Sequence, residues 1–211
     1  NTNALKYIKW GENQEIIIKQ GKDKGSRVKG FQNISSVGER KDWYSLGKRN
    51  VCKFIVPCSF NDSFKVFINS GVFVDKRLYE GYSDYESLPV ILNSILFPLF
   101  MELGSRVALG EGLLDVTVDE VQKIKCIDPR QIHISEELLP KRDIKSVFEE
   151  CGIDPKSDIP IEKQEPHPLP DRMELDNVVF EALNLSLDER KDVYRAVCRL
   201  VWNRISKAQS I

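Results

Sequence analysis

The stretch VCKFIVPCSFNDSFKVFI, residues 51–68, contains two runs rich in β-branched and aromatic residues, Val51–Phe60 and Phe64–Ile68. A turn-forming Asn-Asp-Ser triplet separates the runs, so the sequence predicts two strands joined by a turn. In SLPVILNSILFPLFMEL, residues 87–103, the apolar residues instead recur at helical spacing. Strands followed by a helix predict an α+β fold, with a mixed or antiparallel sheet and a helix packed on it.

The residues before this stretch also favour strands. Leu5–Trp10 and Glu15–Lys19 are strand-like, and the Gly/Lys-rich Gly21–Gly30 is typical of a loop or a hairpin tip. Val72–Asp75 is a further strand candidate. Within the predicted helix, Pro98 is expected to cause a kink, because proline removes a backbone hydrogen bond.

The last third of the chain indicates helices. A short helix is expected over 142–151, and five prolines in 154–171 predict an extended linker. Helices at about 172–184 and 187–207 form the predicted C-terminal helical hairpin, and Ser186 and Glu189 between them match a capping box. The predicted regions are a domain over 1–130, a short helix with the Pro-rich linker over 131–171, and the hairpin over 172–211.

Charge is unevenly distributed along the chain. The net charge is +7 over residues 1–70, −5 over 71–129 and −3 over 130–211, although the whole chain carries only −1. Such sorting can create a basic surface on a nearly neutral protein. A solvated Lys-rich loop is the alternative interpretation of the same residues.

Composition places the chain among ordinary globular proteins. No apolar run is long enough for a membrane span, and no signal peptide is visible. Five cysteines without paired spacing indicate reduced, mostly buried thiols, as in a cytoplasmic protein. The polar start without an initiator Met suggests a fragment of a longer protein.

Catalytic chemistry has no clear signature in this sequence. The only histidines, His133 and His167, stand apart from any Cys or Asp cluster, so neither a zinc site nor a Cys-His pair is predicted. Gly110 and Gly112 form a bare GxG without the third glycine of a dinucleotide site. The chain also lacks the Asn/Asp-Pro-Pro-aromatic motif of amino-methyltransferases and a Gly-rich loop for a methyl donor.

Five short motifs follow one another in order along the chain: WYSL at 43–46, LNSIL at 92–96, RVALGEGLL at 106–114, VDEV at 118–121 and IDP at 127–129. Together they resemble the specificity region of the TaqI-like adenine-N6 DNA methyltransferases. The last helix is more loosely similar to the tails of such enzymes in prokaryotes. The resemblance implies a target-recognition domain of a restriction–modification enzyme, with double-stranded DNA and an N-terminal catalytic domain of the same protein as partners. S-adenosylmethionine would bind that catalytic domain, and this part would contain no cofactor.

A base-flipping enzyme needs DNA held by phosphate contacts and read by base contacts. Candidate DNA-binding residues are therefore cations, an aromatic residue and two loop glycines: Lys22, Lys24, Arg27, Lys29, Arg40, Lys41, Tyr44, Lys48, Arg49, Arg106, Gly110 and Gly112. Arg40, Arg49 and Arg106 are the candidates for reading bases, since Arg can bond guanine with two hydrogen bonds.

Each candidate also has a structural interpretation. Trp43 is expected in a core, and Tyr44 is left open between core and DNA. The two glycines can belong to a plain connecting loop, and Arg106 can pair with Glu102. A rival function is a protein-interaction or scaffold module that docks a partner subunit through the helical tail. A self-contained enzyme is the third possibility.

Overall fold

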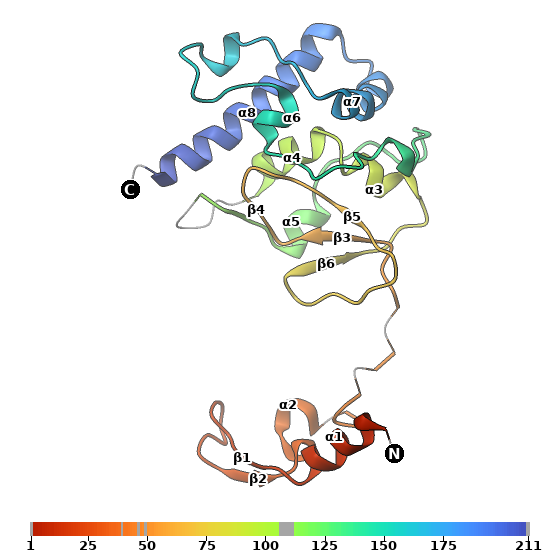
Figure 1. The fold of residues 1–211 in the computed structure, drawn as a ribbon, viewed down its shortest axis with the longest axis vertical. Helices are drawn as coiled ribbons and strands as arrows, with labels where there is room; N and C mark the ends of the chain where they lie inside the picture. Colours follow the sequence, from red (N-terminus) through yellow and green to blue (C-terminus); the bar gives the residue numbers. More distant parts are fainter. Residues whose placement is uncertain (1, 39, 46, 49, 106–111, 210–211) are drawn as a thin grey trace. The chain divides into compact units, whose positions relative to one another are not determined.

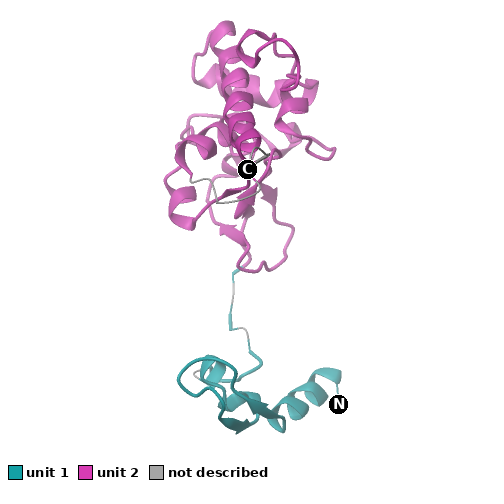
Figure 2. Ribbon diagram, turned by 90° about the vertical axis from the view of Figure 1, so that its left-hand side faces the viewer, with its two compact units in different colours: residues 1–50 teal, residues 51–211 magenta. Residues whose placement is uncertain are grey.

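The structure, a computed structural model, describes residues 2–38, 40–45, 47–48, 50–105 and 112–209 (Figure 1). Its internal contacts divide the chain between Asn50 and Val51 into two compact units (Figure 2). We call residues 1–50 unit one and residues 51–211 unit two. The predicted boundary near residue 130 lies inside unit two, because the linker and the helical tail pack with the sheets in one body.

Unit one begins with a helix where the sequence favoured a strand. Its elements are α1 Asn3–Glu12, β1 Glu15–Ile17, β2 Arg27–Lys29, the 3₁₀ turn η1 Phe31–Asn33 and α2 Ser35–Gly38. The strand prediction for Leu5–Trp10 is therefore wrong. The side chain of Thr2 accepts a hydrogen bond from the Leu5 N–H, and Asn13 donates to the Lys9 carbonyl, so local caps fix both ends of α1.

The predicted hairpin is present in unit one. β1 and β2 pair antiparallel, with Ile16 opposite Val28 and Glu15 opposite Lys29. The Gly25 N–H donates to the Ile18 carbonyl at 2.8 Å, which closes the tip. The expectation of a strand within Glu15–Lys19, followed by a hairpin tip, is confirmed.

Unit two is built on short antiparallel strands. β3 Phe54–Pro57 lies between β5 Phe67–Ile68 and β6 Leu78–Gly81, and β4 Ser59–Phe60 pairs with β7 Leu114–Asp115. The strand expected at Val72–Asp75 is absent, and β6 follows it instead. Asn69 explains the difference, because its side chain accepts from the Gly71 and Val72 N–H groups and holds these residues in a turn.

The long helix expected over 87–103 is two helices, α3 Ser87–Ile91 and α4 Leu96–Gly104. The break falls at Asn93 and not at Pro98. The Asn93 side chain accepts from the Val66 N–H and donates to the carbonyls of Val66 and Pro89, so two of these three hydrogen bonds tie the break to a distant segment of the chain. Pro98 lies in the first turn of α4, where its missing N–H has no helical partner to lose.

The remaining elements complete the helical part of unit two. They are α5 Val118–Gln122, the 3₁₀ turn η2 Glu136–Leu138, α6 Val147–Cys151, the 3₁₀ turn η3 Ile161–Lys163, α7 Pro170–Ala182 and α8 Leu187–Gln209. The capping box before α8 is confirmed, since Ser186 and Glu189 exchange backbone and side-chain hydrogen bonds. Tyr194, Val197 and Val201 on the apolar stripe of α8 are buried.

The Pro-rich segment 154–171 is packed and is not an extended linker. Ile161 and Pro166 are buried, and Arg195 on α8 donates to the Gln164 carbonyl at 2.8 Å. Figure 1 shows α8 running beside α4 and α6, with this segment folded against it. The helical tail is thus part of the core, and the α+β class with a C-terminal helical pair is confirmed.

Two smaller predictions can be checked on the same structure. All five cysteines are free, and only Cys126 is exposed. Among the described residues, none of the helices combines the length and the apolar character that crossing a membrane requires.

Candidate nucleic-acid interface

The β1–β2 hairpin carries four of the predicted cations. Lys22 and Lys24 lie at its tip, and Arg27 and Lys29 lie on β2 with the half-buried Val28 between them. Since side chains alternate along a strand, Arg27 and Lys29 share one face of the hairpin. All four cations are exposed, and within the described part of the chain none of them forms an ion pair. They are therefore free to meet an anionic partner.

Three further candidates lie in the segment after α2, also in unit one. Arg40, Lys41 and Lys48 are exposed, and an Arg40 N–H reaches the Ser45 carbonyl at 3.5 Å. In total, unit one contains eleven Lys and Arg against five Asp and Glu, a net charge of +6. Unit two has twenty against twenty-seven, a net charge of −7. The charge asymmetry of the sequence therefore coincides with the division into two folded units.

An aromatic cluster, defined here as Tyr7, Trp10, Phe31, Trp43 and Tyr44, joins the elements of unit one. Trp43 is half-buried at its centre, with ring centroids 5.0 Å from Phe31 and 5.8 Å from both Tyr7 and Tyr44. Trp43 therefore packs as expected of a core residue. Tyr44 touches it edge-on yet remains 46% exposed, so both interpretations of Tyr44 stay open.

Close packing around Trp43 depends on Gly11. A Cβ atom at this position would lie 2.5 Å from the Trp43 ring and 2.8 Å from the Phe31 ring. Only a glycine lets α1 approach the two rings so closely. Even so, no hydrophobic side chain among the described residues of unit one is buried. The aromatic cluster is thus a core that stays open to solvent on one side.

Four candidates remain, and one of them lies among the described residues. Arg49, Arg106 and Gly110 lie outside the described residues. Gly112 is in unit two, where its φ of 65° agrees with the predicted need for glycine. A Cβ atom at Gly112 would lie 3.1 Å from Ile205 and from Ala208, both on helix α8. Gly112 therefore faces this helix and not an exposed surface open to phosphates. Gly112 is buried and serves packing in this structure.

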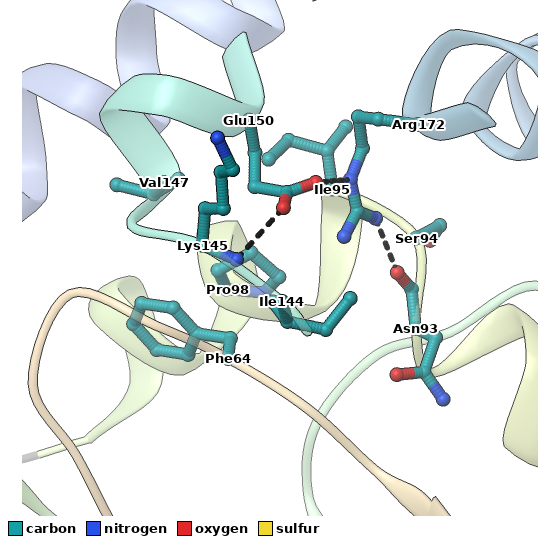
Figure 3. Close-up of a pocket in the computed structure, with 10 residues that line it drawn as sticks. All are labelled: Phe64, Asn93, Ser94, Ile95, Pro98, Ile144, Lys145, Val147, Glu150 and Arg172. Atoms are coloured by element: carbon teal, nitrogen blue, oxygen red, sulfur yellow. Dashed lines mark hydrogen bonds and ion pairs between the residues drawn. The ribbon is translucent and has the colours of Figure 1, made fainter. Parts of the chain in front are cut away.

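Unit two contains a partly buried charge cluster that sequence reasoning missed. Arg142 donates to Glu150 at 2.6 Å and to Asp171 at 2.7 Å, and Arg172 donates to Glu150 at 3.1 Å. Figure 3 shows Arg172 reaching between the Glu150 carboxylate and the Asn93 carbonyl. These contacts join α6, α7 and the break between α3 and α4. No spacing in the sequence signals them, because the partners are 8 to 79 residues apart.

The ionisation of this cluster follows from its contacts. Burial raises the pKa of Glu150, but the hydrogen bonds from Arg142 and from the Lys145 N–H outweigh burial and hold the pKa below its ordinary value. For Asp176 burial dominates and raises the pKa to about 6, although Arg172 lies nearby. The small hollow beside Glu150 and Arg172 is lined mostly by apolar and neutral side chains, and these two buried charged groups pair with each other. We therefore interpret it as a structural feature of the tail.

Metal chemistry finds no support in the geometry. Across the described residues, no three His, Cys, Asp or Glu side chains gather as a metal site would require.

Comparisons of the chain with protein-family models, with curated proteins and with solved structures find no match.

Proposed function

We propose that the chain recognises and positions double-stranded DNA for an adenine-N6 DNA methyltransferase of a restriction–modification system. The observation that carries this proposal is the hairpin of unit one, which presents Lys22, Lys24, Arg27 and Lys29 without ion-pair partners in the described chain. Affinity for DNA comes largely from cations that displace condensed counterions from phosphates. Unpaired, exposed cations on one small folded unit supply this interaction.

The two units divide the work on this view. Unit one, at +6, attracts the phosphate backbone, while unit two, at −7, is not suited to bind it over its whole surface. Base reading would fall to Arg side chains near the duplex, with Arg40 in unit one as the described candidate. Arg49 and Arg106 remain candidates from the sequence.

Methyl transfer itself would be the task of another domain of the same protein. That catalytic domain would bind S-adenosylmethionine and receive the flipped adenine, whereas this chain would hold the duplex in register. A cytoplasmic location fits this role and the free cysteines.

The rival proposal, a scaffold that docks a partner through the helical tail, has less support. The apolar stripe of α8 is already buried within unit two, where Val197, Cys198 and Val201 have no exposed surface. A partner subunit cannot use a stripe that the chain itself covers.

Fluorescence anisotropy of the chain with a labelled duplex tests the proposal. If all four hairpin cations contact phosphates, raising the salt from about 50 to 200 mM should weaken binding roughly a hundredfold. Binding that is absent at low salt, or that does not change with salt, contradicts the proposal. A control variant with Lys123, Lys125, Lys141 and Lys156 of unit two changed to Gln removes four exposed cations and should retain the affinity.

A further inference from the structure

The two outermost rings of the aromatic cluster, Tyr7 and Trp10, lie side by side on α1. Their centroids are 5.5 Å apart with an interplanar angle of 27°, a stacked pair. Trp10 follows Tyr7 at the i, i+3 spacing, so a helix places the two rings on one face, whereas a strand would point them to opposite faces. The helical conformation of α1 thus creates a surface that the predicted strand could not have.

Both rings keep much of their area in solvent. Tyr7 is 55% and Trp10 is 50% exposed, and the ring centroids of Trp10 and Phe31 are 5.6 Å apart. The two neighbouring rings form an exposed apolar patch. Globular proteins commonly use such patches for binding. Packing against Phe31 and Trp43 holds the pair in place, so a ligand would not have to order it.

Two lysines of α1 lie close to the stacked pair in sequence. Lys6 lies one turn before Trp10 on the same side of the helix, and Lys9, directly before Trp10, lies about a quarter-turn around the helix axis. Both are exposed, and neither forms an ion pair in the described part of the chain. Flat rings beside unpaired cations match the chemistry of a nucleic-acid strand, whose bases stack on aromatic side chains while its phosphates meet Lys or Arg. An apolar protein partner would not need the two lysines.

We propose that Tyr7 and Trp10 form a stacking platform for unpaired DNA bases, distinct from the phosphate contacts of the hairpin. This inference rests on the proposed function. It adds that unit one contacts DNA bases as well as the phosphate backbone. An enzyme that flips one base out of a duplex leaves unstacked bases at that position, and a ring pair lowers the free energy of this opened state.

The test compares the affinity of the full chain for an intact duplex and for the same duplex with a single-nucleotide bulge. The bulged base is already unpaired and need not be separated from a partner, so the chain should bind this duplex about five times more tightly or better, the lower end of what one base–aromatic stack contributes. Trp10→Ala and Tyr7→Ala should each bring the ratio of the two affinities close to one. Both should leave the salt dependence on the intact duplex unchanged.

Controls separate stacking from loss of the fold. Trp10→Phe keeps an aromatic ring and should keep most of the preference for the bulged duplex. Ile17→Ala removes another exposed apolar side chain of unit one and should keep this preference in full. If the wild-type chain binds both duplexes equally with normal salt dependence, the platform is refuted while the proposed function stands. A preference that survives both alanine variants also refutes it. If the chain binds neither duplex, the proposed function fails and the platform with it.

Discussion

The Arg204 guanidinium on α8 and the Glu102 carboxylate on α4 form a buried ion pair, 102 residues apart in sequence. The distance from Arg204 Nη2 to Glu102 Oε1 is 2.6 Å, and the side chains are only 2% and 4% exposed. Arg204 also donates to the backbone carbonyls of Asn61 and Gly112. One side chain thus joins the helical tail to three other segments of unit two.

The first prediction follows from this pair. Arg204→Met leaves the Glu102 carboxylate buried without its partner, which is expected to lower the free energy of unfolding by about 3–5 kcal/mol. Urea denaturation measures the change. Arg199→Met is the matched control, since Arg199 is half exposed and its distance to Glu162 is 3.6 Å, and it should cost less than about 1 kcal/mol. Equal effects of the two substitutions would show that the ion pair does not anchor the tail.

The second prediction concerns the pH dependence of stability. Burial raises the pKa of Asp176 to about 6, above its value in the unfolded chain, so the folded state holds a proton that the unfolded state releases between about pH 4 and 6. Stability from this group is therefore present below pH 4 and is lost as the pH rises through 6. The loss is on the order of 3 kcal/mol.

Asp176→Asn isolates this effect. Asparagine can still accept from the Ile95 N–H and can meet the Tyr194 hydroxyl, the two hydrogen-bond partners of Asp176. Relative to this variant, the wild-type chain should lose stability between pH 4 and 6 in parallel chemical denaturations. The exposed Asp158→Asn should retain the wild-type profile. Parallel profiles of wild type and Asp176→Asn would mean that Asp176 does not titrate in this window.

The third prediction concerns proteolysis. Lys48 is exposed next to the division between the two units, whereas Lys156 and Lys163 belong to the Pro-rich segment that packs on α8. Proteases need a locally opened chain, so trypsin should cut at Lys48 well before it cuts at Lys156 or Lys163. Mass spectrometry of timed digests identifies the order. Early cleavage at Lys156 or Lys163 would instead support the extended linker that the prolines alone predict.

Much of the fold could be predicted from residues whose local pattern and tertiary environment agree. The strands within 51–68 and the α8 stripe are examples, since most of the apolar residues there are also buried. The break at Asn93 could not be predicted, because its cause is a pair of hydrogen bonds to Val66, 27 residues away. Pro98, the obvious local breaker, instead fits the first turn of α4.

The candidate site shows the same limit. The hairpin cations could be predicted, because the charged residues and the turn-forming residues lie close together in the sequence, within Gly21–Gly30. The Tyr7–Trp10 pair could not, because the aromatic and β-branched residues in Leu5–Trp10 favour a strand. Caps at Thr2 and Asn13, together with packing of α1 on Trp43, decide for a helix. The stacked rings follow from that choice alone.

The most direct test of the central claim is the salt dependence of DNA binding after Lys22, Lys24, Arg27 and Lys29 are changed together to Gln. These cations are proposed to contact phosphates, so the slope of log affinity against log salt should become shallower by roughly one unit per lost contact, and binding should weaken on every duplex sequence. The unit-two variant with Lys123, Lys125, Lys141 and Lys156 changed to Gln should keep the wild-type slope. If the hairpin variant also keeps the wild-type slope and affinity, the hairpin is a solvated loop and unit one does not hold DNA through it.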